Sequence, residues 1–296
     1  MDTDESRVSQ DYRAIEEAQK DLFTHEDEAK AVAPPQFPFV IKSLHVRECL
    51  AEFLSTFIYV AFGLGVNAQV ILSKAAAGDY LSVTIGWGIG VMLAMHVGGS
   101  VSYSHINPAI TLTLAVYGVF PWKKVPGYVI AQVLGAFMAS LMIYAMYYQI
   151  LHVADPTKTT TGVVFYTHPN QYVNHASAFL TEFCATAVLL CCLLALSDEK
   201  NRPTVVPSFP SCVGILVVGI GMAFSLISSA ALNPARDFGP RLMLAIVGYD
   251  GVFSANDHYF WIPIVAPIAG GIVGAAVYIV LILAHHPAKV VPQRFF

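Results

Sequence analysis

The tripeptide Asn-Pro-Ala occurs twice in the chain, at Asn107–Ala109 and Asn233–Ala235. Each copy opens a short apolar segment, 108–119 and 234–245. Asn is a favoured helix N-cap and Pro a favoured first helical residue. A capping Asn uses its side-chain oxygen as acceptor, which leaves its NH2 donors available. Both segments are too short to cross a bilayer, so we expect two capped half-helices.

A cationic side chain follows the second tripeptide. Arg236 is the third helical residue after the Asn233 cap, and its guanidinium carries five donors and no acceptor. An arginine inside a membrane segment is expensive and usually functional. We therefore expect Arg236 to hold a hydroxyl or carbonyl group at a constriction; the alternative is an ion-paired or snorkelling structural arginine. Asp237 and Arg241 lie four residues apart on one helical face, where a structural role is expected.

Two acidic residues occupy equivalent apolar segments. Asn107 follows Glu52 by 55 residues, and Asn233 follows Glu182 by 51. Carboxylates in such segments indicate either proton coupling or acceptors for the irregular backbone that leads into each half-helix. We favour the second interpretation, in which they brace the two loops.

The composition predicts where these groups lie. Hydrophobic residues make up 56% of the 296 residues and charged residues 12%, about half the share in soluble domains. A span needs about 20 apolar residues. The segments that qualify as spans are 48–72, 80–100, 122–150, 175–197, 211–230 and 259–284. The sequence thus predicts an all-α membrane protein with six transmembrane helices and two re-entrant half-helices.

The chain divides into two similar halves between two tails. Repeat one covers about 45–152 and repeat two about 175–285, within a channel domain at 45–285. Three spans per half is an odd number, so the repeats must be inverted, which places a solute path near the bilayer midplane. An acidic tail (1–44) precedes this domain and a short tail (286–296) follows it. The net charge of −4 arises in the first tail and gives no indication of nucleic-acid binding.

Basic residues between the spans predict the orientation. Cytoplasmic loops carry an excess of Lys and Arg. The larger set comprises Lys42, Arg47, Lys123, Lys124, Lys200, Arg202, Lys289 and Arg294. Both termini are therefore expected in the cytoplasm, and the plasma membrane is the expected location.

The segments Ser104–Ala109 and Ala231–Arg241 resemble the major intrinsic protein family, the aquaporins and glycerol facilitators. The resemblance covers roughly residues 45–285. It implies that the half-helices meet end to end in mid-membrane, that each protomer has its own pore, and that four protomers assemble in the lipid bilayer. Asp237 and Arg241 resemble the signature of the glycerol-conducting branch.

The resemblance also implies a selectivity filter. Trp87 lies 20 residues before Asn107 and matches the family's aromatic filter position, opposite Arg236; an interfacial tryptophan is the alternative. Gly221 and Ala230 lie 12 and three residues before Asn233. Both are small, which is typical of pores that also pass urea and other small neutral solutes.

His105 precedes the first tripeptide by two residues and is a titratable residue near the predicted path. One interpretation is that His105 has only a structural role in the loop. The alternative is a pH-sensitive pore residue whose protonation near pH 6 changes permeability.

The sequence as a whole predicts an aquaglyceroporin: a passive channel for glycerol, water and other small neutral solutes, with no enzymatic activity, cofactor or metal. One alternative is an inverted-repeat transporter that couples protons through Glu52 or Glu182. A second is a water-selective aquaporin, against which Gly221, Ala230 and Asp237 argue.

Overall fold

The computed structural model describes residues 39–198, 200 and 208–286. Within these ranges six helices are long and apolar enough to cross a membrane, which confirms the six predicted spans. They are α2 (Leu44–Leu72), α3 (Tyr80–Ser102), α5 (Val125–Ala154), α6 (His175–Ser197), α7 (Phe209–Ser228) and α10 (Ile262–Leu281). The predicted ends differ from these by a few residues. The two tails fall almost wholly outside the described residues, so their boundaries stay predictions.

Short elements connect the spans. The half-helices are α4 (Pro108–Val116) and α8 (Pro234–Ile246). The remaining pieces are η1 (Trp122–Lys124), η2 (Thr161–Val164), α9 (Ala255–His258), η4 (Tyr259–Trp261) and η5 (Leu283–His285). The half-helices are therefore helical where the capping pattern predicts, and each begins at the Pro of its tripeptide.

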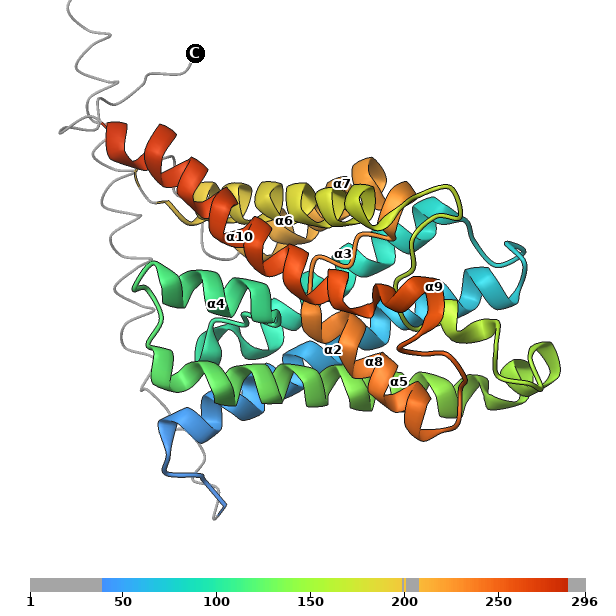
Figure 1. Ribbon diagram of the computed structural model, residues 1–296. Coiled ribbons are helices and arrows are strands. Elements are labelled where there is room, and N and C mark those ends of the chain that lie inside the picture. Colours follow the sequence, from blue (N-terminus) through green and yellow to red (C-terminus); the bar gives the residue numbers. More distant parts are fainter. Residues whose placement is uncertain (1–38, 199, 201–207, 287–296) are drawn as a thin grey trace, which may run out of the picture. The chain divides into compact units, whose positions relative to one another are not determined.

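The packing of the first half repeats in the second. Helix α2 packs against α3 and α5, and α6 packs against α7 and α10 in the same way. Each half-helix then lies against spans of both halves, α4 on α10 and α5, and α8 on α5 and α10. Figure 1 shows α4 and α8 entering from opposite ends and approaching each other near the middle of the bundle. This is the inverted repeat that the odd number of spans per half requires.

Glycines allow some of these helices to approach closely. A Cβ atom at Gly270 or Gly274 of α10 would collide with the backbone of α6 at Phe183 and Ala187. Small residues four apart are the common way for helices in a membrane to make close backbone contact. The α6–α10 contact holds the wall against which α4 packs.

Candidate functional site

The two half-helices are capped as the sequence predicts. The side-chain oxygen of Asn107 accepts from the backbone N–H of Ala109 at 2.8 Å. That of Asn233 accepts from the N–H groups of Ala235 and Arg236, at 2.9 and 3.3 Å. Both acceptor oxygens are thus committed to their own helices. The positive ends of two helix dipoles face the same region.

The same two asparagines join the repeats. The amide nitrogen of Asn107 donates to the Leu232 carbonyl at 2.9 Å, and that of Asn233 donates to the Ile106 carbonyl at 2.7 Å. Each NH2 group has two hydrogens and uses one of them in these bonds between the repeats, so each asparagine has a second N–H that they do not use. The centre of the molecule therefore presents two donors at the meeting point of two positive helix ends.

The loops before the half-helices adopt backbone conformations that need support. Ile106 and Leu232 have φ of 49° and 57°, and Ser104 and Ala230 have 47° and 44°. Left-handed conformations are unfavourable for residues other than Gly. These backbone conformations turn the loop N–H groups away from helical hydrogen bonding, so the groups need other acceptors inside the protein.

Glu182 and Glu52 supply those acceptors and are both 0% exposed. Glu182 accepts from the N–H groups of Ala231 and Leu232 at 2.8 and 3.0 Å. In the equivalent place, Glu52 accepts from the N–H groups of His105 and Ile106 at 2.8 and 2.7 Å. The two carboxylates thus accept from the same kind of loop N–H pair in the two repeats.

The Glu52 carboxylate has two further partners. It accepts from the Ser102 hydroxyl at 2.7 Å and from the Gln132 amide at 2.8 Å. Gln132 also donates to the Thr111 hydroxyl at 3.0 Å. Through Ser102, Gln132 and Thr111, the hydrogen bonds of Glu52 on α2 therefore link it to α3, α5 and α4.

Trp87 and Arg236, the two predicted filter residues, are in direct contact. The guanidinium carbon of Arg236 lies 4.4 Å from the centre of the Trp87 ring, and one of its nitrogens donates to the Phe165 carbonyl at 3.3 Å. The resemblance places the two side chains on opposite walls, whereas the structure stacks the cation on the aromatic face. Arg236 is 5% exposed.

One face of α2 holds the Trp87 ring. Tyr59, Gly63 and Asn67 are one helical turn apart on that face. The Tyr59 ring meets Trp87 edge-on at 5.2 Å, and the indole N–H donates to the Asn67 side chain at 3.2 Å. A Cβ at Gly63 would collide with the indole, so only glycine leaves room for it. Sequence reasoning missed these three residues, although their four-residue spacing was visible.

Gly221 lies against α3, and Ala230 packs against the buried cluster that includes Leu189 and Leu232. A side chain added at Gly221 would begin 3.1 Å from a methyl carbon of Thr84 in α3. The Gly221 carbonyl accepts from the Tyr80 hydroxyl at 2.6 Å. Ala230 is partly buried in the loop before α8. Their effect on the width of the pore stays a prediction.

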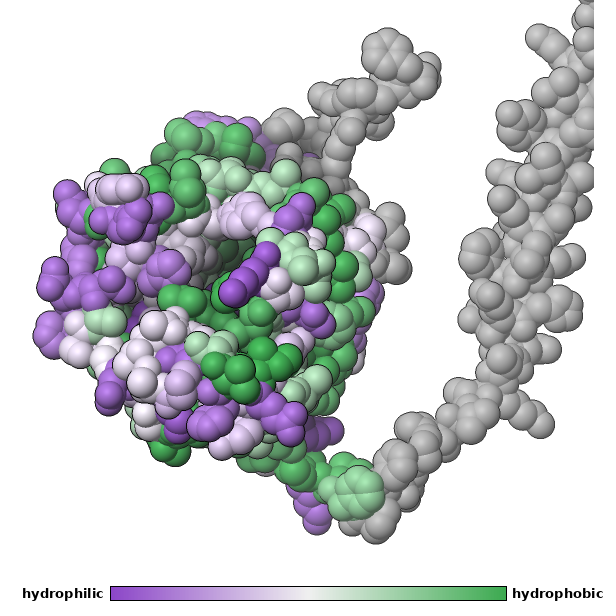
Figure 2. Space-filling view, turned by 90° about the vertical axis from the view of Figure 1, so that its right-hand side faces the viewer, coloured by the Kyte–Doolittle hydropathy of each residue, from purple (hydrophilic) through white to green (hydrophobic). Residues whose placement is uncertain are grey.

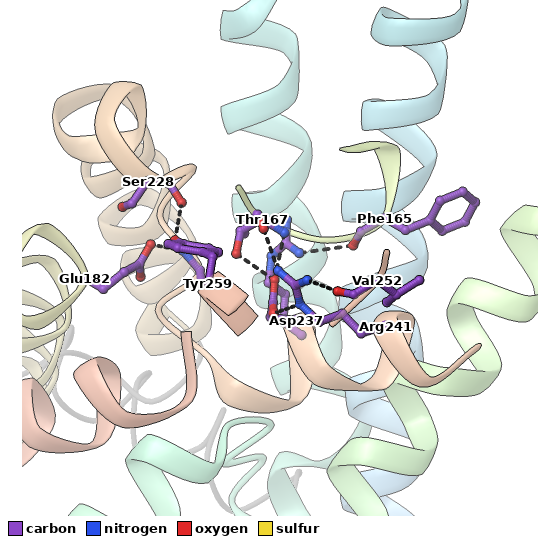
Figure 3. A network of polar contacts seen from close by, with 10 residues as sticks. Phe165, Thr167, Glu182, Ser228, Asp237, Arg241, Val252 and Tyr259 are labelled. Atoms are coloured by element: carbon purple, nitrogen blue, oxygen red, sulfur yellow. Dashed lines mark hydrogen bonds and ion pairs between the residues drawn. The ribbon is translucent and has the colours of Figure 1, made fainter. Parts of the chain in front are cut away.

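Asp237 and Arg241 form a buried network with the segment that follows η2 (Figure 3). Asp237 is 0% exposed, forms an ion pair with Arg241, and accepts from the N–H and hydroxyl of Thr167 at 2.7 and 2.6 Å. Arg241 donates to the carbonyls of Thr167 and Val252, both at 2.7 Å. Buried charges are stable only when paired and hydrogen-bonded in this way.

The network also bears on the filter. Its partner Thr167 is two residues from Phe165, whose carbonyl accepts from Arg236. The pair therefore holds the loop segment whose Phe165 carbonyl accepts from Arg236.

A cavity of about 1040 Å³ leads from one end of the bundle to the caps. We call it the vestibule. Residues from both repeats line it, including Glu48, Tyr59, His105, Asn107, Lys124, Leu189, Val213 and Asn233. At its mouth the Lys124 ammonium donates to the Glu48 carboxylate at 2.7 Å. Figure 2 looks onto the other end of the molecule, where a hollow lies at the centre, with hydrophilic residues gathered mainly on the left of its rim and hydrophobic residues on other parts of it.

His105 lies in the wall of the vestibule and is 7% exposed. Its Nδ1 atom is 3.2 Å from the Thr111 hydroxyl, and its ring packs on Phe120 and Tyr128 at 4.8 and 5.1 Å. The backbone N–H of His105 is held by Glu52. His105 thus packs against neighbouring side chains and also lines the vestibule.

Comparisons with known proteins agree with this architecture. The family model of the major intrinsic protein matches residues 40–278. Aquaglyceroporin-2 of Rhizophagus irregularis is 44% identical over 239 residues, which are 78% of this chain and 76% of that protein. Human aquaporin-9 is 37% identical over 84% of this chain and 86% of its own length.

A solved structure adds the three-dimensional match. The X-ray structure of the aquaglyceroporin from Plasmodium falciparum aligns with a TM-score of 0.73 and 31% sequence identity, covering 79% of this chain and 95% of that one. The six apolar helices and two capped half-helices thus have the same arrangement as a known channel. The chain belongs to the major intrinsic protein family and is an integral, multi-pass membrane protein.

Proposed function

We propose that this protein is an aquaglyceroporin, a passive channel that conducts glycerol, water and other small neutral solutes such as urea. The observation that carries the proposal is the pair of interlocked caps at the inner end of the vestibule, next to the Trp87–Arg236 filter. Relatives named as aquaglyceroporins support the glycerol-conducting branch.

The chemistry of the path favours neutral hydroxyl compounds. Two helix N-termini and the Arg236 guanidinium place positive potential along it, which opposes protons and other cations. The same groups are hydrogen-bond donors that a hydroxyl oxygen accepts from. The Trp87 ring and the aliphatic wall contact the carbon side of a polyol. Conduction of this kind involves no covalent chemistry and no cofactor.

The braces argue against proton-coupled transport. Glu52 accepts four hydrogen bonds and Glu182 accepts two from backbone, and both carboxylates are sealed from solvent. A proton carrier has to exchange with water on each side of the membrane. Their loss of charge would release the loops that carry the caps.

Assembly and orientation are parts of the same proposal. The family resemblance supports a homotetramer in which each protomer has its own pore. The basic residues at the vestibule end, among them Arg47, Lys123 and Lys124, support a cytoplasmic vestibule and cytoplasmic termini. We place the protein in the plasma membrane.

His105 is a second titratable group on the proposed path. Its contacts with Phe120, Tyr128 and Thr111 support the structural interpretation, and its place in the vestibule wall supports pH sensitivity. Glycerol flux measured between pH 5 and 8 for the wild type and His105→Ala distinguishes the two. An unchanged pH dependence in the variant refutes the pH-sensitive role.

The decisive experiment uses the purified protein in lipid vesicles, with light scattering after sorbitol, glycerol and urea gradients. Water and glycerol permeability should both exceed those of empty vesicles. Fast water flux without glycerol flux would refute the glycerol assignment. A transporter predicts accumulation of glycerol against its gradient when a pH gradient is imposed, whereas a channel only equilibrates it.

A further inference from the structure

A buried tyrosine supports the end of the helix that precedes each half-helix loop. Tyr259 in η4 donates its hydroxyl hydrogen to the Ser228 carbonyl at the end of α7, at 3.2 Å (Figure 3). Tyr128 near the start of α5 donates to the Ser102 carbonyl at the end of α3, at 3.3 Å. Both tyrosines are 1% exposed, and each serine lies five residues before the Asn of its tripeptide. The two contacts are therefore equivalent in the inverted repeat.

The Ser228 carbonyl lacks the donors that a continuing helix would supply. In a helix it would accept from the N–H group four residues on, or three on in a tighter turn, which here belong to Leu232 and Ala231. Both N–H groups donate to the Glu182 carboxylate instead. Among the residues that the structure describes, only the Tyr259 hydroxyl donates to this carbonyl, and Ser228 is 0% exposed. The glutamate thus accepts, and the tyrosine donates, in place of the interrupted helical hydrogen bonds, since a buried carbonyl without a donor is costly.

The turn that Tyr259 supports leads directly to a predicted filter residue. Ser229 and Ala230 follow Ser228 with φ of 66° and 44°, and the second of them is the predicted filter position. Two successive left-handed residues other than Gly keep this conformation only where surrounding contacts hold it. The Ser229 hydroxyl donates to the His168 carbonyl at 2.9 Å. The hydroxyls of Tyr259 and Ser229 therefore hold the turn from two sides, immediately before Ala230.

Tyr128 supports the other side of the caps. Its ring lines the vestibule and packs on His105 at 5.1 Å, and the turn that it supports leads to that histidine. Tyr259 is not among the residues that line the vestibule, and it packs in a buried cluster with Ala178 and Ile262. The same contact thus occurs twice, once before the vestibule loop and once before the loop of the predicted filter.

We propose that Tyr259 is a positioning residue for solute selection. Its hydroxyl fixes the turn at the end of α7, and thereby the place of Ala230 and of the backbone groups that follow in the loop before α8. A polyol is larger than water and carries several hydroxyl groups, so its passage depends more strongly on where the wall holds its own polar groups. The inference rests on the proposed glycerol conduction and adds to it a residue that acts on the filter without contacting the solute.

The test is Tyr259→Phe, which removes the hydroxyl and keeps the buried ring. Tyr249→Phe is the matched control, since Tyr249 is 7% exposed and its hydroxyl lies 2.8 Å from that of Thr161, in a contact that involves neither half-helix loop. Both variants lose one buried hydroxyl contact, so a general loss of stability should appear in both as a lower unfolding midpoint in detergent. Glycerol and water permeability are measured in the same vesicles at equal content of folded protein.

We expect Tyr259→Phe to lower the glycerol-to-water permeability ratio about fivefold, the factor that corresponds to about 1 kcal/mol for one net hydrogen bond. Tyr249→Phe should keep the wild-type ratio. A wild-type ratio in folded Tyr259→Phe, or an equal change of the ratio in Tyr249→Phe, overturns the inference. If Tyr259→Phe yields no folded protein, Ser229→Ala, which frees the same turn from the His168 carbonyl, decides by the same criterion. A wild-type protein that conducts water but no glycerol overturns the proposed function instead, and this inference with it.

Discussion

Gly63 is the position where one added carbon atom would most directly disturb the proposed filter, because it lies against the Trp87 ring. Replacing it by Ala adds a Cβ atom that would lie under 3.0 Å from three atoms of the Trp87 ring, Cδ2, Cε3 and Cζ3. The indole has to recede by about 1.4 Å to restore van der Waals contact. It cannot do so freely, because Arg236 is stacked on it and Asn67 holds its N–H.

The energies of Gly63→Ala oppose each other. Ala is favoured over Gly in a helix by about 1 kcal/mol. Overpacking of a filled site costs about 1–3 kcal/mol. The protein should therefore still fold, with the strain relieved by a shift of Trp87 toward Arg236. A shift of that size at the Trp87–Arg236 contact should reduce glycerol permeability about tenfold or more, as 1.4 kcal/mol corresponds to a factor of ten.

Gly65→Ala is the control on the same helix, since its added Cβ would meet only Ile143, at 3.7 Å. Both variants are reconstituted into vesicles and compared by light scattering in glycerol and sorbitol gradients. We expect Gly65→Ala to match the wild type and Gly63→Ala to lose glycerol flux. If Gly63→Ala conducts glycerol and water as well as Gly65→Ala does, Trp87 is not part of the filter or is not held by α2.

Three further predictions concern the braces, the buried pair and the small filter residues. Glu182→Gln has one acceptor oxygen for two loop N–H groups, so we expect a loss of about 1–3 kcal/mol in stability, measured by unfolding in detergent; a variant as stable as the wild type contradicts the brace. Arg241→Lys keeps the charge, but a single ammonium nitrogen cannot reach the three acceptors that the planar guanidinium spans, so it should lose about 1–3 kcal/mol, visible as a lower unfolding midpoint; normal stability would exclude the network as a support. Gly221→His combined with Ala230→Phe should lower glycerol flux more than water flux, and an equal fall in both would remove these residues from the filter.

Much of the fold could be predicted because its signals are local. A run of about 20 apolar residues is enough to mark a span, and two capped segments too short to cross mark the half-helices. The caps of Asn107 and Asn233 and the acceptor roles of Glu52 and Glu182 also follow from groups near each other in the chain or in equivalent repeat positions.

The faces of the helices could not be predicted in the same way. Lipid and the protein interior are both apolar, so hydropathy does not distinguish the lumen side of α2 from its lipid side. For that reason the sequence does not predict that Tyr59, Gly63 and Asn67 contact the Trp87 ring. It also does not predict the hydrogen bond between Asp237 and Thr167, because the two residues are 70 positions apart in the chain.

The sequence by itself determined the membrane class, the inverted repeat and the chemical groups that face each other at the centre, because capping, charge and span length are properties of short segments. Only the tertiary structure decided that Arg236 stacks on Trp87 rather than standing across the lumen from it. The distance between them depends on how α2, α3 and α8 pack, and on the glycine that lets the indole lie against α2. Packing of this kind is a sum of contacts between distant segments, and no local pattern encodes it.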